Sequence, residues 1–171
     1  MAIGANDAVR IDANAGSALE VAKYISAYAK DQGYDMILTG KETIDYNGSE
    51  VGGMIAELLN QPFISYASKL DIAGETATIN RDVEGGIETL EVNTPFVLSA
   101  SKGLAEQRIP NMRGIMMAKK KPLNVVTPDA VEGNTAISNF ELPAEKSGVK
   151  LIDADNIDEL VRLLHEEAKV I

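Results

Sequence analysis

The part of the sequence best suited to hold a ligand is a glycine-bearing loop between an apolar run and a helical pattern. Residues 36–38 are apolar and predict a buried parallel strand, and residues 49–59 carry apolar side chains at helical spacing. In open α/β sheets, ligands bind beyond the carboxyl ends of the strands, where a helix N-terminus offers free amide donors to a phosphate. Glycines would let the backbone approach such a ligand closely, and this segment contains Gly40, Gly48, Gly52 and Gly53.

The pair Gly40-Lys41 does not complete a phosphate-binding P-loop. Asp35 replaces the first glycine of that motif, and Glu42 stands where a Ser or Thr would hold magnesium. On the residues alone, two interpretations stay open. The loop either binds phosphate through its backbone or is a plain glycine-rich connection that turns the chain.

The other residues that could do chemistry indicate no catalytic centre. His165, the only histidine, stands beside two glutamates in a helical pattern and is interpreted as a surface side chain. The absence of cysteine excludes a thiolate metal cluster, a disulfide and a cysteine nucleophile. Asp153 and Asp155 flank one alanine, a pattern more typical of a helix cap than of a cation site. We therefore expect a protein that is not an enzyme and holds no metal.

Composition limits the kind of protein and its partners. A chain of 171 residues that is 45% hydrophobic predicts one packed domain with appendages. The formal net charge of -10 disfavours binding to nucleic acid or to anionic lipid. No apolar run approaches the roughly 20 residues of a membrane-spanning helix, and the first residues lack a signal-peptide pattern. We expect a cytoplasmic protein without membrane insertion.

The elements that must position the loop follow from apolar periodicity and turn residues. Alternation predicts a strand at residues 8–13, and Ser17 is expected to cap a helix that ends near Lys30. A polar loop is expected after Ser101, and Asp155 is expected to cap a last helix. Short strand patterns separated by glycine turns occupy residues 63–70, 77–83, 87–92 and 96–98. This order predicts an α/β fold with an antiparallel insertion.

The middle of the chain carries the most specific pattern. Residues 79–90 read Ile-Asn-Arg-Asp-Val-Glu-Gly-Gly-Ile-Glu-Thr-Leu and are followed by Pro95 and by Val97-Leu98-Ser99. This segment resembles the signature of electron transfer flavoprotein β subunits at each defining position. On the residues themselves, Gly85-Gly86 is a hairpin turn, so the segment identifies the family without having to touch a ligand.

The resemblance implies a three-layer α/β fold whose mostly parallel sheet is flanked by helices, of the adenine-nucleotide-binding, flavodoxin- or Rossmann-like kind. An antiparallel hairpin insertion and an extended C-terminal arm complete it. The expected boundaries are residues 1–126 for the nucleotide-binding domain, which we expect to be truncated at its start, and 127–171 for the arm and last helix. The family usually begins with a further strand and helix carrying a Lys-x-x-Pro-Asp motif, and no segment here matches them.

The loop after the strand at residues 36–38 resembles the adenine-nucleotide loop of this family, which holds AMP or, in the electron-bifurcating branch, a second FAD. Glu42 and Glu50 replace glutamines that are usual there, and Tyr46-Asn47-Gly48 departs from a more acidic run. The nucleotide-binding residues implied are Gly40, Lys41, Glu42, Thr43, Ile44, Asp45, Asn47, Gly48, Ser49, Glu50 and Val51.

Residues 100–121 resemble the segment with which the family docks on dehydrogenases. Met112 falls where the family has an apolar anchor, and a flexible thioether suits an adaptable surface. From the residues alone, Met112 in the core and a solvated basic run at Lys119–Lys121 are the alternative interpretation. The docking residues implied are Leu104, Glu106, Arg108, Met112, Ile115 and Met116.

The resemblance also implies partners. A β subunit pairs through its arm and last helix with an α subunit that holds most of the FAD, and it serves dehydrogenases and a quinone oxidoreductase as an electron-carrier subunit. Two alternatives remain: a standalone adenine-nucleotide-binding module, and a β subunit of the bifurcating branch with a second FAD.

Overall fold

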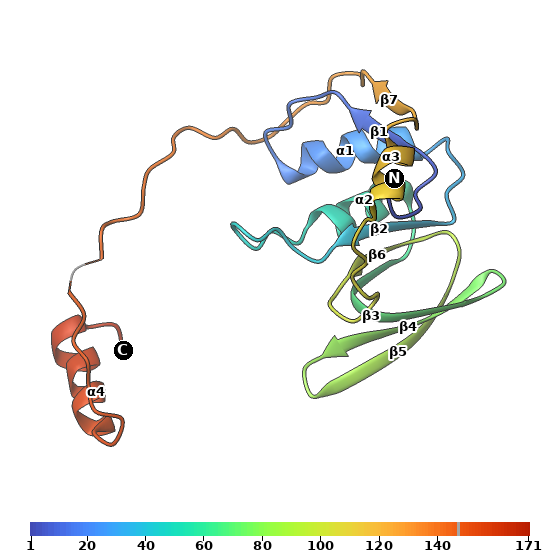
Figure 1. Cartoon of the computed structure of the whole chain (residues 1–171). Helices are drawn as coiled ribbons and strands as arrows, with labels where there is room; N and C mark the ends of the chain where they lie inside the picture. The colour runs from blue at the N-terminus through green and yellow to red at the C-terminus, as the bar shows by residue number, and fades with distance from the viewer. Residues whose placement is uncertain (147) are drawn as a thin grey trace. The chain divides into compact units, whose positions relative to one another are not determined.

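The computed structural model describes residues 1–146 and 148–171, which fall into two compact units, Met1–Ile137 and Ser138–Ile171. The first unit carries the sheet and the candidate loop, and the second carries the last helix (Figure 1). In chain order the elements are β1 (Ala8–Ile11), α1 (Ala18–Ala29), β2 (Met36–Gly40), α2 (Val51–Leu59), β3 (Phe63–Ala73), β4 (Thr76–Val83), β5 (Gly86–Asn93), β6 (Phe96–Ala100), α3 (Met112–Ala118), β7 (Leu123–Val126), α4 (Ile157–Leu163) and the π-helical turn η1 (Leu164–Ala168).

A five-stranded mixed sheet in the order β2-β6-β3-β4-β5 forms the centre of the first unit. The strands β2, β6 and β3 run parallel, so that Val97 lies between Ile37 and Phe63. The strands β3, β4 and β5 run antiparallel and are joined by turns in which Gly74 and Gly85 adopt φ of +64° and +88°. Such positive φ angles favour glycine. The predicted α/β class and its hairpin insertion are confirmed.

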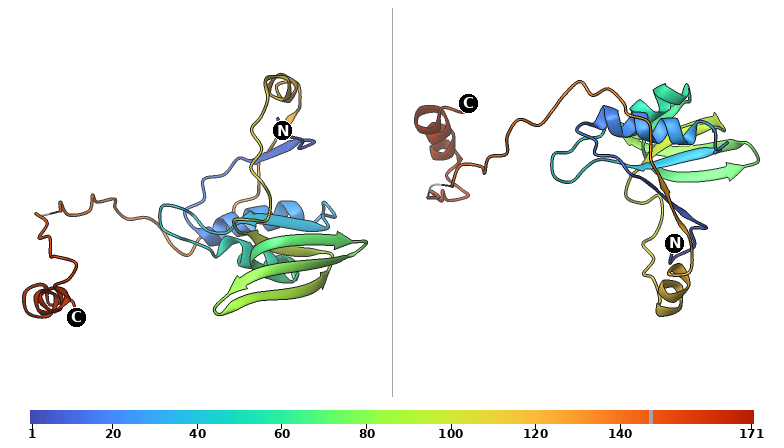
Figure 2. Two further views of the ribbon diagram at one scale, coloured as in Figure 1. Left: turned by 60° about the horizontal axis from the view of Figure 1, so that its bottom comes forward. Right: turned by 90° about the horizontal axis from the view of Figure 1, so that it is seen from above.

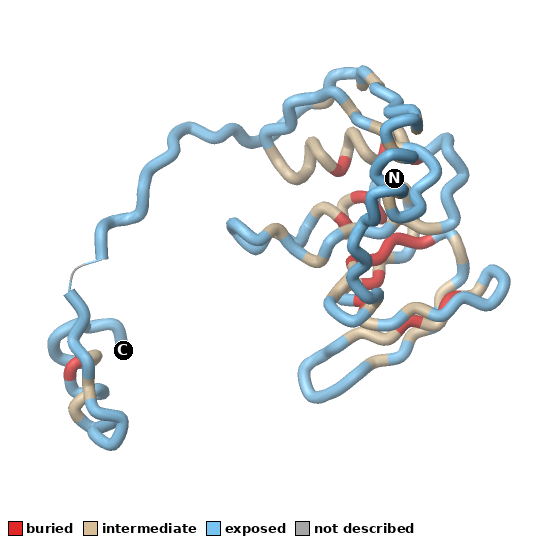
Figure 3. The backbone as a smooth tube through the Cα atoms, in the orientation of Figure 1, coloured by how far each residue is buried: buried red, intermediate tan, exposed pale blue. Residues whose placement is uncertain are grey.

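The side chains of β6 show how both faces of the sheet become covered. Val97 packs on one face against Ala22 of α1 and Ile55 of α2. Phe96 and Leu98 alternate to the other face, where they pack with Ile64 of β3 and Ile79 of β4. All three side chains are fully buried, and this strand is the buried stretch at the centre of Figure 3. Residues 96–98 therefore form the core strand that the sequence predicted.

The helices α1 and α2 pack against each other on one side of the sheet (Figure 2). Helix α1 begins as predicted, because the Ser17 Oγ accepts a hydrogen bond from the Glu20 N–H at 3.3 Å. Helix α2 ends at Asn60, which adopts a left-handed conformation with φ of +53°. None of the helices in the described part of the chain has the length and apolar character needed to cross a membrane.

The strand β1 lies outside the five-stranded sheet and forms a two-stranded parallel ribbon with β7. The sequence predicted β1 but not its partner. The prediction of a polar loop after Ser101 is wrong at residues 112–118, which form the helix α3. Asn111 caps this helix, because its Oδ1 accepts a hydrogen bond from the Gly114 N–H at 2.7 Å. Both views of Figure 2 show α3 and the ribbon standing away from the large sheet.

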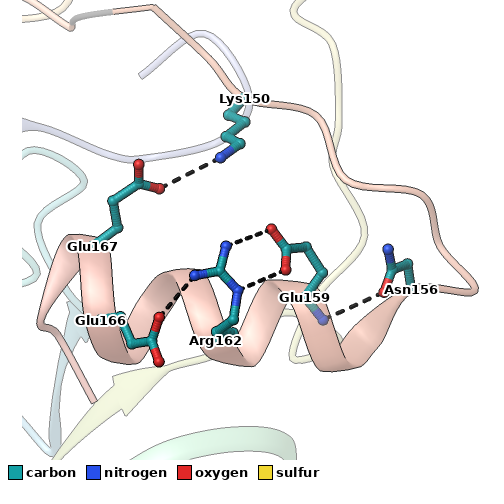
Figure 4. A network of polar contacts seen from close by, with 6 residues as sticks. All are labelled: Lys150, Asn156, Glu159, Arg162, Glu166 and Glu167. Carbon is teal, nitrogen blue, oxygen red and sulfur yellow. Dashed lines mark hydrogen bonds and ion pairs between the residues drawn. The ribbon is translucent and has the colours of Figure 1, made fainter.

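The second unit contains the short helix α4, whose surface carries ion pairs within the helix and with η1. The Arg162 guanidinium contacts Glu159 at 2.8 Å and Glu166 at 2.7 Å (Figure 4). The predicted cap, Asp155, is wrong. The cap is Asn156, whose Oδ1 accepts from the Glu159 N–H at 3.4 Å. Asp155 lies one residue before the cap, in a turn where its N–H donates to the Asp153 Oδ1 at 3.0 Å.

Candidate functional site

The candidate loop, residues 41–50, leaves the carboxyl end of β2 beside the carboxyl end of β6, at the level where β3 stops pairing with β6. Gly40 pairs with Ala100, and Ala100 pairs with Ala67 on the far side. The loop then leads into the first turn of α2 at Val51. This edge of the parallel strands is the place at which open α/β sheets bind ligands. The residues expected to bind nucleotide form one continuous segment from the end of β2 to the start of α2.

Thr43 closes this loop on itself. Its N–H donates to the Gly48 carbonyl and its carbonyl accepts from the Asn47 N–H, each at 2.9 Å. The Thr43 Oγ1 also accepts from the Gly48 N–H at 2.9 Å. A Cβ at Gly48 would collide with the Tyr46 ring, so a larger residue here would have to displace that exposed side chain. Closure leaves Ile44 at the tip fully exposed.

The first turn of α2 has no side-chain cap. The cap residue, Glu50, makes no side-chain hydrogen bond to the amides of this turn. Those amides are the donors that favour an anion at a helix N-terminus. The Val51 side chain, by contrast, packs against the core with Ile55, so a ligand would meet the Val51 backbone.

Lys41 is the cation of the loop. Its Nζ lies 3.0 Å from the Glu42 Oε1 and 5.8 Å from the centroid of the Tyr66 ring. Tyr66 comes from β3 and was not among the residues that the sequence singled out. Tyr66 lies near Lys41 because β2, β6 and β3 pair side by side. No local pattern in the sequence predicts that pairing.

One of the expected docking residues is half-buried, and the others are exposed. Leu104 is half-buried against the core formed by β3, β4 and β6. Glu106 and Arg108 are exposed, and Met112 and Met116 on α3 are 73% and 64% exposed. The alternative that placed Met112 in the core is therefore wrong. Ile115 is exposed to a smaller degree, at 39%.

The amino-terminal residues pack against α3 and its end. A Cβ at Gly114 would collide with the Ala2 carbonyl, and the Lys121 Nζ donates a hydrogen bond to the Ala5 carbonyl. The run of three lysines is thus not wholly solvated. Within the described residues there is no cluster of three or more His, Cys, Asp or Glu side chains suited to a metal ion.

Two hollows of the first unit lie away from the loop. One, of about 270 Å³, lies at the amino ends of β2 and β6 and is lined in part by Lys30, Tyr34 and Gln61. The other, of about 360 Å³, lies between α1 and the chain around Val126. No predicted nucleotide-binding residue lines either hollow. A ligand of the loop would therefore lie on an open surface at the strand ends.

The chain thus contains an α/β domain with a candidate ligand loop at the strand ends and a hairpin insertion, and comparison with known proteins identifies its family. A family model described as "Electron transfer flavoprotein domain" matches residues 1–131. The electron transfer flavoprotein subunit beta of Bacillus subtilis is 37% identical, over all of this chain and 72% of its own length. The human subunit beta is 29% identical, over 99% of this chain and 69% of its own length. A mitochondrial subunit beta of Oryza sativa is 35% identical and is covered over 61% of its length.

The chain belongs to the electron transfer flavoprotein β-subunit family. This confirms the identification made from residues 79–99. The roles expected for the loop, for the docking residues and for the boundary between residues 126 and 127 stay predictions, as does the cytoplasmic location.

Proposed function

We propose that this β subunit binds AMP on residues 40–51, pairs with an FAD-bearing α subunit through residues 127–171, and presents residues 100–121 to dehydrogenases. The observation that carries the proposal is the loop at the carboxyl ends of β2 and β6, with Lys41 at its start and a helix without a side-chain cap after it. In this arrangement the subunit performs no catalytic step. The FAD supplies the electron chemistry, and this chain supplies a nucleotide site and surfaces for partners.

The charges of the loop favour a nucleotide with one phosphate. Lys41 and the amides of α2 attract an anion, whereas Glu42, Asp45 and Glu50 are all exposed in the same loop. The two further phosphates of ATP would lie among these carboxylates without another cation from the loop. AMP therefore fits the loop better than ATP does.

Exposed apolar side chains in the arm support the proposed pairing with an α subunit. Phe140, Leu142 and Leu151 are 84%, 94% and 90% exposed. On the last helix, Ile157 and Val161 are also exposed. Large apolar side chains gathered in one segment mark a surface that a partner covers.

The helix α3 supports the proposed docking of dehydrogenases. Met112 and Met116 present flexible thioethers to solvent, beside Arg113 and the lysines that follow the helix. A partner with an apolar pocket rimmed by carboxylates would complement this surface. The same chemistry suits a quinone oxidoreductase that receives the electrons.

Calorimetric titration of the heterodimer with AMP and ATP tests the nucleotide site. We expect AMP to bind, ATP to bind more weakly, and Lys41→Met to weaken AMP by about tenfold or more, because a hydrogen bond to a charged group is lost. The matched control is Lys69→Met, which removes a lysine paired with Asp71 at 2.7 Å on the hairpin. Equal losses in both variants, or no AMP binding by the heterodimer, would contradict the proposal.

The same titration separates the alternatives. Tight AMP binding by the 171-residue chain without an α subunit, and no complex with one, would indicate a standalone module. Competition between FAD and AMP for the loop, with two FAD per heterodimer, would indicate the bifurcating branch.

A further inference from the structure

Tyr66 has an unusual backbone at the end of the parallel sheet. Its φ is +57°, a left-handed conformation that an aromatic residue rarely adopts. The register of β3 against β6 shifts across Tyr66, between Ile64 and Ala67, and its register against β4 shifts just after it, between Ala67 and Lys69. Irregularities of this kind re-aim a side chain and are common beside functional sites.

The neighbouring strand β6 holds this conformation in place. The Tyr66 N–H donates to the Ser99 Oγ at 2.9 Å, and Ser99 is buried at 3% exposure. The next residue along β3, Ala67, is fully buried and its carbonyl accepts from the Ser101 N–H at 2.8 Å. The backbone around Tyr66 is therefore fixed, although the residue as a whole remains 39% exposed.

The ring lies beside the cation of the candidate loop. The Lys41 Nζ is 5.8 Å from the ring centroid, within the range in which a ring face attracts an ammonium group. Glu42 holds the same ammonium from the loop side at 3.0 Å. Without Tyr66, the flexible stem of Lys41 would be free to follow Glu42 alone.

We propose that Tyr66 is the positioning residue of the loop, holding the Lys41 ammonium at the carboxyl ends of the strands where it meets a nucleotide phosphate. The part that concerns phosphate rests on the proposed function. An arriving phosphate competes with Glu42 for Lys41, while the ring face keeps the ammonium near the strand ends. Tyr66 itself contributes its ring face, so phenylalanine can replace it.

Two variants separate this role from a structural one. Tyr66→Gly removes the ring and relieves the backbone, because glycine adopts positive φ freely, and Tyr66→Phe keeps the ring. Lysine side-chain NMR on the nucleotide-free chain reads the contact directly, through the upfield ring-current shift of the Lys41 methylene protons next to Nζ. We expect Tyr66→Gly to abolish this shift and Tyr66→Phe to retain it, with no fall in melting temperature for Tyr66→Gly.

AMP titration of the heterodimer reads the consequence. We expect Tyr66→Gly to weaken AMP about two- to fivefold, the size of a partly exposed cation–π contact, and Tyr66→Phe to bind as wild type. In a Lys41→Met background, Tyr66→Gly should change the affinity no further.

A Lys41 shift that survives Tyr66→Gly would overturn the proposal, as would an equal loss of AMP affinity in the glycine and phenylalanine variants. A heterodimer that binds no AMP, but whose Lys41 shift depends on the ring, would support the positioning of Lys41 and refute the proposed function.

Discussion

Two adjacent glycines in α2 are expected to respond to the same substitution with opposite signs. A Cβ at Gly52 would lie 2.7 Å from the Thr39 Oγ1 and 3.0 Å from the Phe63 ring. The Thr39 hydroxyl is hydrogen-bonded to the Leu98 carbonyl at 3.3 Å, so it cannot move without losing that bond. At Gly53 the Cβ would lie 3.5 Å from the Phe63 ring, an ordinary contact.

The magnitudes follow from two opposing terms. Alanine stabilises a helix interior by about 1 kcal/mol relative to glycine, which is the upper limit in the first turn where these glycines lie, and overpacking a core costs about 1–3 kcal/mol. Gly53→Ala receives only the first term, and we expect it to raise the free energy of unfolding by up to about 1 kcal/mol. For Gly52→Ala the second term dominates, and we expect a loss of about 1–2 kcal/mol.

Urea denaturation followed by circular dichroism measures both variants, and equal m-values would show that only stability has changed. Because Gly52 seats the start of α2 on β2, we also expect Gly52→Ala to weaken AMP binding and Gly53→Ala to leave it unchanged. If Gly52→Ala stabilises the chain as much as Gly53→Ala does, the close packing of α2 on Thr39 is refuted.

Three further predictions concern the helix end, the docking surface and the last helix. Asn60→Ala should lower the free energy of unfolding by about 1 kcal/mol, because its left-handed φ of +53° disfavours alanine, whereas Asn60→Gly should not, as denaturant melts would show. Met112→Asp should weaken binding to a dehydrogenase without changing the melting temperature, because the side chain is 73% exposed, and a fall in melting temperature would contradict this. The hydrogen bond from Arg162 lowers the pKa of Glu159. The ionised Glu159 carboxylate therefore stabilises helix α4 at neutral pH, and this stabilisation is lost as the pH falls through the lowered pKa. Arg162→Met should raise the pKa of Glu159 in an NMR titration of the full chain.

Much of the fold could be predicted because its signals are local. The apolar run at residues 96–98 and the glycines at 74 and 85 mark a core strand and two turns through side-chain chemistry within a few residues. Ser17 likewise caps α1 through a contact within one turn of helix. Elements of this kind need no knowledge of distant neighbours.

The elements that were missed depend on contacts across the chain. The strand β7 has four residues, and it forms by pairing with β1, far away in the sequence. The seven-residue helix α3 is too short for a clear apolar period, and Gly114 packs against Ala2 instead of a neighbour in sequence. The cap of α4 was misplaced by one residue, because the helix begins at Ile157 and the adjacent Asn156, also a good cap residue, supplies the acceptor.

The candidate site likewise has one part that could be predicted from the sequence and one that could not. The loop from Gly40 to Val51 is continuous in the sequence and could be predicted from it. The position of Tyr66 could not, since its left-handed backbone depends on a bond to the buried Ser99 of another strand. Tertiary contacts set this conformation, and tyrosine has no intrinsic preference for positive φ that would reveal it in the sequence.

The central claim is that residues 40–51 hold one AMP in a heterodimer whose FAD belongs mainly to the α subunit. The most direct measurement is the nucleotide content of the purified heterodimer after denaturation, separated by chromatography and quantified per heterodimer. We predict one AMP and one FAD, with the AMP lost and the FAD retained when Lys41 is replaced by methionine. Two FAD without AMP, or one FAD with no adenine nucleotide besides it, would contradict the claim.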